Sequence, residues 1–112
     1  MYYVNGPDIL RNLFEAGLEL VVIGGGHNNC YPIIRAAATH SAGRTLPLDV
    51  VNLDPHADCR NVAEGRHSGN GFSTAFGEGL IRKYFLCGYH NRYNSQACNQ
   101  APSLVSLFRC VH

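Results

Sequence analysis

Residues 48–58 read LDVVNLDPHAD and carry the strongest structural signal in the sequence. Its first six residues form a short, mostly aliphatic run that is typical of a β-strand. Directly after it, Asp54, His56 and Asp58 occupy alternate positions, and alternation along an extended chain places side chains on one side. We therefore expect a strand over residues 48–53 that delivers an acid, an imidazole and a second acid to one edge of a sheet.

The separation of the two acids requires a bend in this segment. In a fully extended chain the Cα atoms of Asp54 and Asp58 would lie about 13 Å apart. One ion could not bind both carboxylates across that distance. We expect the chain to curl after His56, where the small side chain of Ala57 permits it.

A second apolar run leads to a histidine. Residues 18–23 (LELVVI) are typical of a strand buried on both faces of a parallel sheet, and Gly24-Gly25-Gly26 and His27 follow them. If this strand and the strand over 48–53 are parallel neighbours, both following loops open at the carboxyl edge of the sheet. That edge is where α/β proteins bind ligands.

Four side chains would then converge at this edge: His27, Asp54, His56 and Asp58. Two imidazoles and two carboxylates suit Mn, Fe, Co, Ni or Zn rather than Ca. Such an ion would lower the pKa of a bound water and supply hydroxide at neutral pH. The alternative is a solvated loop in which the aspartates cap a helix and His27 hydrogen-bonds to its neighbours.

The rest of the sequence alternates between helical and strand patterns. We expect helices over residues 8–16, 29–42 and 94–101, strands over 83–87 and 103–111, and a long glycine-rich loop over 59–79. This alternation predicts an α/β fold with a mostly parallel sheet of about four strands, in a single domain over residues 1–112. So few helices would cover such a sheet poorly, and we expect the chain to belong to something larger or to need a partner chain.

Composition excludes several classes of protein. Nine Lys and Arg against eight Asp and Glu give a net charge of +1, which offers no basic surface for nucleic acid or an anionic membrane. No apolar run approaches the roughly 20 residues that span a bilayer. The five cysteines are irregularly spaced, unlike a disulfide framework, and the first 20 residues carry acidic side chains, unlike a signal peptide. We expect a cytoplasmic protein with reduced thiols.

Three motifs resemble those of the ureohydrolases, the family of arginase, agmatinase and formimidoylglutamase. The motifs are Gly24-Gly25-Gly26-His27, Asp54-Pro55-His56-Ala57-Asp58 and Ser68-Gly69-Asn70, in the family's order and at similar spacing. The resemblance implies a three-layer α/β/α fold, a binuclear Mn²⁺ centre and hydrolysis of a C–N bond in a guanidino or formimino substrate. Family members begin well upstream of the first motif, so the chain looks truncated at both ends.

By position, the resemblance assigns roles to the candidate ligands. His27 and Asp58 would bind the first ion, His56 would bind the second, and Asp54 would bridge both. Asp58 is also the residue that we expect to be catalytic. The resemblance further implies that a hydroxide between the two ions attacks the imino carbon and that the tetrahedral intermediate expels an amine or ammonia.

The sequence departs from the family pattern at the second ion. Family members supply two further aspartates from a later Asp-x-Asp motif, and no Asp follows Asp58 in this sequence. The second ion would keep only His56 and the shared Asp54, which is too few ligands to hold it well. We expect one Mn²⁺ ion to be held more readily than two, with weak or absent turnover.

The pattern around the predicted substrate-binding residues resembles the formimidoylglutamase branch more than arginase. Phe72 stands where arginase has a histidine, and Arg60 completes an Asp-x-Arg pattern that resembles this branch. Arg60 could clamp a substrate carboxylate through two parallel hydrogen bonds, or it could be a solvated loop charge. Ser68 and Asn70 could hydrogen-bond the substrate, or they could be ordinary turn residues.

Two functions follow from these patterns. The first is a metal-dependent hydrolase of guanidino or formimino C–N bonds, here without the second aspartate pair. The alternative is a non-catalytic α/β binding or assembly module derived from the same family, which would dock through an open sheet edge or apolar face. The hydrolase predicts stabilisation by metal, whereas the module predicts homo-oligomers that depend on protein concentration.

Overall fold

The structure, a computed structural model, describes residues 6–39, 45–94 and 105–108. Three α-helices are formed: α1 (Gly6–Glu15), α2 (Cys30–Ala38) and α3 (Gly71–Gly77). Three β-strands accompany them: β1 (Leu48–Leu53), β2 (Ile81–Cys87) and β3 (Val105–Phe108). Short 3₁₀ turns lie at His27–Asn29, Val62–Glu64 and Asn91–Tyr93.

The three strands form one parallel sheet in the order β1-β2-β3. Val50 pairs with Tyr84 between β1 and β2, and Tyr84 pairs with Val105 between β2 and β3. Because all pairs are parallel, the carboxyl ends of the strands share one edge of the sheet. The predicted α/β class with a parallel sheet is confirmed.

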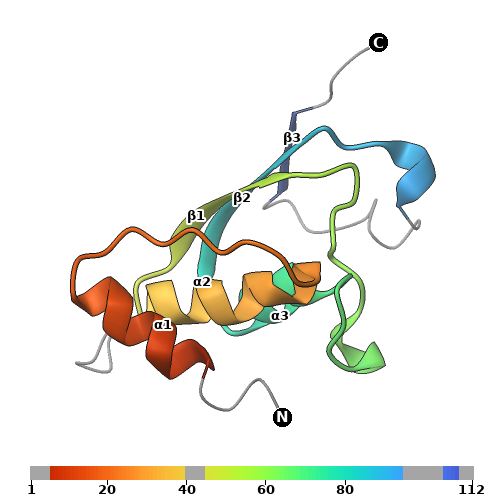
Figure 1. The fold of residues 1–112 in the computed structure, drawn as a ribbon. Helices are drawn as coiled ribbons and strands as arrows, with labels where there is room; N and C mark the ends of the chain where they lie inside the picture. Colours follow the sequence, from red (N-terminus) through yellow and green to blue (C-terminus); the bar gives the residue numbers. More distant parts are fainter. Residues whose placement is uncertain (1–5, 40–44, 95–104, 109–112) are drawn as a thin grey trace.

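The helices cover the sheet on the side of the even-numbered residues of β1. Helix α2 packs against β1 and α3, helix α3 packs against β2, and α1 packs outside on α2 (Figure 1). Asn52 is buried on the covered side, whereas Val51 and Leu53 point the other way and are 69% and 84% exposed. One face of β1 is therefore packed and the other is open to solvent.

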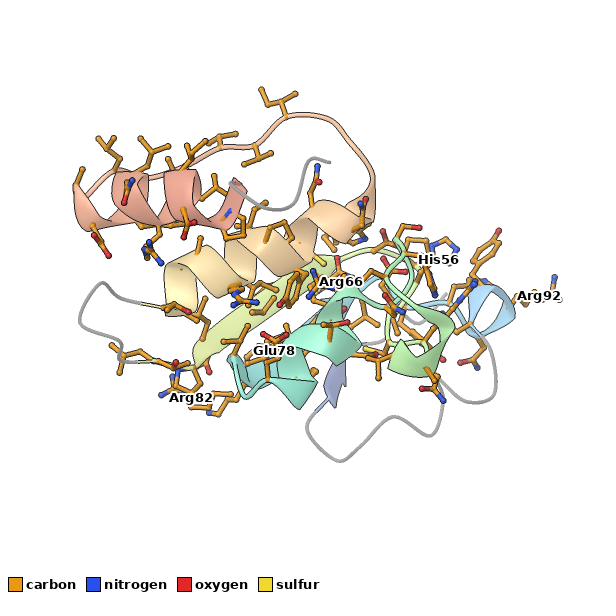
Figure 2. The ribbon with its side chains drawn as sticks, turned by 90° about the horizontal axis from the view of Figure 1, so that it is seen from below. His56, Arg66, Glu78, Arg82 and Arg92 are labelled. Carbon is orange, nitrogen blue, oxygen red and sulfur yellow. The ribbon has the colours of Figure 1, made fainter. Side chains whose placement is uncertain are left out.

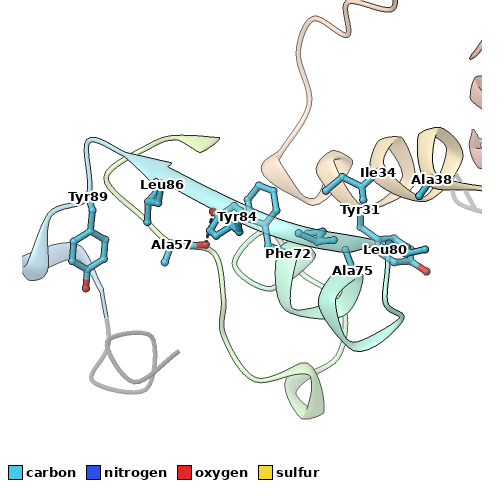
Figure 3. Packing of buried hydrophobic residues seen from close by; sticks show 11 residues of the cluster. Tyr31, Ile34, Ala38, Ala57, Phe72, Ala75, Leu80, Tyr84, Leu86 and Tyr89 are labelled. Carbon is cyan, nitrogen blue, oxygen red and sulfur yellow. Dashed lines mark hydrogen bonds between the residues drawn. The ribbon is translucent and has the colours of Figure 1, made fainter. Parts of the chain in front are cut away.

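The core lies between β2 and helices α2 and α3 (Figure 3). Tyr84 and Leu86 of β2 are fully buried and stand at its centre. Phe72 and Phe76 of α3 both contact the Tyr84 ring, with ring centroids 4.7 and 6.0 Å away. Their spacing of four residues puts them on one face of a helix, and this face holds α3 on the sheet.

One predicted strand is not formed. Residues 18–23 run as an irregular segment from the end of α1 toward α2 (Figure 1), with Val21 86% and Ile23 92% exposed. An apolar run shows only that a segment could be buried in a sheet, whereas a strand also needs a neighbouring strand for its backbone hydrogen bonds. In the described part of the chain this segment has no such neighbour, and the prediction of a strand there is wrong.

The predicted loop over residues 59–79 is also partly wrong, because it contains α3 and the turn Val62–Glu64. Its glycines suggested a loop, but burial of Phe72 and Ala75 outweighs their low helix propensity.

The other predicted elements agree with the structure to within a few residues where it describes them. The predicted strand over 83–87 begins two residues earlier as β2, and the helix over 29–42 ends at Ala38, before the undescribed residues 40–44. The helix predicted over 94–101 lies almost wholly outside the described residues, as does the part of the strand over 103–111 that flanks β3. Among described residues, no helix is long and apolar enough to cross a membrane.

Candidate metal centre

Three of the four predicted ligands meet beyond the carboxyl end of β1. His27, Asp54 and Asp58 each offer a ligand atom, and these atoms all lie within 4.8 Å of one another. His27 Nδ1 is 2.5 Å from Asp58 Oδ2 and 3.6 Å from Asp54 Oδ2. An imidazole and two carboxylates at this separation can bind one divalent transition-metal ion.

His27 reaches this position through its glycine loop. Gly24 and Gly25 have φ angles of +91° and +81°, a region that residues with a Cβ rarely adopt. His27 then opens a short 3₁₀ turn that continues into α2. The glycines therefore turn the chain so that the histidine faces the end of β1.

The loop after β1 curls as its spacing predicted. The Asp54 N–H donates to Cys87 O at 3.0 Å and so extends the β1–β2 ladder by one residue. Asp54 Oδ1 then accepts the His56 N–H at 2.7 Å, and Asp58 adopts a left-handed φ of +48°. This curl brings the two carboxylates to a common point, as the chemistry of a shared ion requires.

His56 lies on the other side of Asp54 and outside the group of three. Its Nδ1 is 2.9 Å from Asp54 Oδ1, whereas His27 Nδ1 lies 3.6 Å from the other oxygen, Oδ2. The His56 ring is half-exposed and tilted against Tyr93, with ring centroids 5.6 Å apart. Asp54 thus offers one oxygen to each side, which is the arrangement that a carboxylate shared between two ions needs.

Burial governs the electrostatics of the group. Burial raises the pKa of Asp58 above its usual value, and the charge of Asp54 adds to this effect although the nearby His27 opposes it. Burial, followed by the charge of Asp58, raises the pKa of the Cys30 thiol to about 12. The Cys30 thiol is therefore protonated at neutral pH in the metal-free protein and adds no negative charge beside the two aspartates.

An open hollow of about 460 Å³ borders the group. It lies between the glycine loop 24–26 and the end of β1, and both His27 and Asp54 line it. A space of this size accommodates a small-molecule ligand.

The predicted substrate residues lie on the loop before α3. Asn70 is only 1% exposed, its Oδ1 accepts the His67 N–H, and its Nδ2 donates to Gly65 O, so the side chain is bound to the loop itself. These contacts favour the second of the two predictions for Asn70, in which it is a turn residue and not a substrate-binding residue. Arg60 and Ser68 are exposed, and the Arg60 N–H donates to Gly69 O at 2.9 Å. Their roles toward a substrate stay predictions.

Two side chains near the ligands make contacts that were not predicted. Phe72 contacts the His27 ring edge-to-face at 5.3 Å, and Asn52 is buried in β1 beneath the curl. The one available signal was Asn52, a polar residue at a position of β1 that faces the core. The contact between Phe72 and His27, in contrast, joins residues far apart in the sequence and leaves no local pattern.

Comparison with known proteins identifies the relatives of this chain. The family model described as "Arginase family" matches residues 7–106. Formimidoylglutamase of Streptococcus gordonii is 32% identical over 91 residues, which cover 77% of this chain and 27% of that protein. Arginase 2, chloroplastic/mitochondrial, of Arabidopsis thaliana is 36% identical over 61 residues, covering 54% of this chain and 17% of that protein.

A solved structure supports the same relationship. A hypothetical agmatinase from Burkholderia thailandensis superposes with a TM-score of 0.65 and 25% identity, covering 77% of this chain and 27% of that one. The chain thus spans about a quarter of the length of this agmatinase and of the formimidoylglutamase.

Proposed function

This chain belongs to the arginase family, and from that premise we propose that it carries the first part of a ureohydrolase metal centre. The reaction of such a centre is hydrolysis of a C–N bond in a guanidino or formimino substrate. The observation that carries the proposal is the group of His27, Asp54 and Asp58, whose ligand atoms lie within 4.8 Å of one another.

The donor set fits a divalent ion of the Mn²⁺ kind. Two carboxylates favour a hard ion, and one or two imidazoles suit a first-row transition metal. When bound, such an ion would lower the pKa of a water and supply hydroxide at neutral pH. His27, Asp54 and Asp58 would hold this ion, and His56 with Asp54 would contribute to a second one.

Asp58 is the residue that we propose as catalytic. Its carboxyl is partly buried, and it belongs to the group of three that would surround the bound ion and the water on it. It also lies directly against His27, which fixes its orientation.

The substrate that we propose carries a formimino or guanidino group and a carboxylate. The similarity to formimidoylglutamases, with Phe72 against His27, favours the formimino branch. Arg60 would bind the substrate carboxylate and Ser68 would hydrogen-bond the substrate, whereas for Asn70 the contacts favour support of the loop.

We also propose that residues 1–112 form part of one ureohydrolase domain and that the protein is cytoplasmic. Among described residues, Cys30, Cys59 and Cys87 are not in disulfide bonds, as expected in a reducing compartment. With only His56 and Asp54 for a second ion, this chain would hold one Mn²⁺ ion and turn over weakly by itself.

Calorimetric titration of Mn²⁺ into the apo protein tests the proposal. We expect one binding site, and a double variant with Asp54→Asn and His56→Asn should bind at least about a hundredfold more weakly, because it loses the Asp54 carboxylate of that site and the neighbouring His56 imidazole. Asp49→Asn is a matched control, because Asp49 lies in β1 but pairs with Arg82 instead of facing the site. Identical titration curves for the unchanged chain and the double variant would refute the proposed metal site.

The assembly module is the second candidate function. The exposed side chains of Val21, Ile23, Val51 and Leu53 favour it, because a protein seldom exposes several large apolar residues without a partner. Sedimentation at several protein concentrations, with and without Mn²⁺, separates the two: the module predicts association that Mn²⁺ does not change.

A further inference from the structure

We propose that Asn94 and Tyr84 are positioning residues that hold the 54–58 loop in the conformation that presents Asp54, His56 and Asp58. The inference rests on the proposed function, because it concerns the metal affinity of that same site. Neither side chain belongs to the ligand group. Both act on the backbone between the ligands.

Asn94 holds the loop from the segment that follows β2. Its Oδ1 accepts the Ala57 N–H at 2.8 Å, and its Nδ2 donates to Pro55 O at 2.7 Å. The same Nδ2 donates to His90 O at 2.9 Å, and the His90 N–H donates to Pro55 O at 3.1 Å. One amide therefore joins residues 55 and 57 to a segment more than thirty residues away in the sequence.

Tyr84 holds the loop from beneath. Its ring is fully buried in β2, and its hydroxyl donates to Ala57 O at 2.9 Å (Figure 3). The hydroxyl also accepts from Asn52 Nδ2 at 2.9 Å, and this amide reaches His56 O at 3.3 Å. Ala57, which separates the ligands His56 and Asp58, is thus bound through both its N–H and its carbonyl.

The backbone of the loop explains why such support is needed. Asp58 has a φ of +48°, a left-handed conformation that is uncommon for residues other than glycine. A conformation of this kind persists only when its surroundings determine it. The hydrogen bonds of Asn94 and Tyr84 fix the residue just before Asp58, and so they hold the Asp58 carboxylate beside His27.

The experiment compares Mn²⁺ affinity in three variants. Asn94→Ala removes the amide, and Tyr84→Phe removes one hydroxyl while keeping the ring. Asn61→Ala is the matched control, because the Asn61 Oδ1 accepts a backbone N–H from Ala63 at 2.9 Å in a loop that holds no proposed ligand. Calorimetry gives the Kd for Mn²⁺, the visible spectrum of bound Co²⁺ reports the geometry of the ligands, and urea unfolding gives the stability of the apo protein.

We expect the Kd to rise about tenfold or more in Asn94→Ala and in Tyr84→Phe, with an altered Co²⁺ spectrum. The control should keep both the affinity and the spectrum of the unchanged chain. If one variant fails to fold, the other still tests the inference.

Two results would overturn the inference. One is wild-type affinity and spectrum in both variants. The other is a loss of apo stability with unchanged affinity in the folded protein, because that result describes structural support alone. In both cases the unchanged chain still binds Mn²⁺. Failure of the unchanged chain to bind Mn²⁺ would instead refute the proposed function, and this inference with it.

Discussion

At the scale of single residues, Gly71 shows how closely α2 and α3 approach each other. It is the first residue of α3, and a Cβ at this position would collide with the Sγ of Cys30 at the start of α2. Gly77 is the last residue of the same helix, and a Cβ there would meet nothing within 4 Å. Two glycines of one short helix therefore differ in whether they tolerate a methyl group.

We predict that Gly71→Ala lowers the free energy of unfolding by about 1–3 kcal/mol, because an added methyl in a packed contact forces the neighbours apart. Gly77→Ala should raise it by about 0.5 kcal/mol, because alanine restricts the unfolded chain. Urea unfolding of the two variants measures both values. Equal stability of the two variants would show that α2 and α3 do not pack as described.

At the scale of elements, an ion pair joins the amino-terminal ends of β1 and β2. Arg82 binds Asp49 through two hydrogen bonds of 2.8 and 2.9 Å, far from His56 (Figure 2). The hydrogen bond from Arg82 is the main cause that lowers the pKa of Asp49 below its usual value. Because the pKa is lower in the folded than in the unfolded state, the pair stabilises the fold above the unfolded-state pKa.

We predict that Asp49→Asn is less stable than the unchanged chain at pH 7. The difference should disappear as the pH falls through the lowered pKa of Asp49, because the carboxylate is then protonated in both states. It should also shrink at high salt, because both side chains are exposed. Thermal unfolding from pH 7 down to pH 2 measures this, and a difference that is constant over this range would contradict it.

The next prediction tests whether residues 18–23 are an exposed irregular segment, as in the structure, or a buried strand. Because the Ile23 side chain is exposed, Ile23→Ala should change the free energy of unfolding by less than about 0.5 kcal/mol. Ile34→Ala is the matched substitution in α2, where Ile34 is 6% exposed, and it should cost about 2–4 kcal/mol. A cost at Ile23 close to that at Ile34 would mean that residues 18–23 form the buried strand that their composition predicts.

These elements also show what the sequence could predict. β1 and β2 were predictable because each is a short apolar run between turn residues. The conformation of residues 18–23 was not predictable, because composition does not show whether another strand lies beside a segment. Helix α3 was not predicted because its glycines have low helix propensity. Burial of Phe72 and Ala75 in the core with Tyr84 outweighs that propensity, and this burial depends on contacts between distant residues.

In the site, too, local features were predictable from the sequence and contacts between distant residues were not. The spacing of Asp54, His56 and Asp58 lies within five residues, so the need for a curl followed from chain geometry alone. The curl itself is stabilised by Asn94 and Tyr84, and nothing near residues 54–58 in the sequence indicates them. The candidate ligands were therefore predictable, and the hydrogen bonds that hold their loop in place were not.

At the scale of the whole molecule, the described residues pack on one side of the sheet and leave the other side open. Val51 and Leu53 on β1 are exposed, as are Val21 and Ile23 before the glycine loop. A fold with so little buried surface has a small margin of stability. Any ligand that binds only the folded state should therefore raise its stability measurably.

Mn²⁺ is the ligand for which we make this prediction. Its proposed ligands come from two segments, His27 before α2 and Asp54 with Asp58 after β1, and only the folded chain brings these side chains together. The free energy of unfolding should rise by about 2.7 kcal/mol when free Mn²⁺ is a hundred times its Kd, and a chelator should reverse the gain. Thermal unfolding across a series of Mn²⁺ concentrations measures it, with the Asp54→Asn, His56→Asn double variant as the control, which should gain no more than about 0.4 kcal/mol at the same Mn²⁺ concentration. A melting temperature that follows protein concentration and ignores Mn²⁺ would instead indicate that association, through the open apolar surface, is what stabilises this chain.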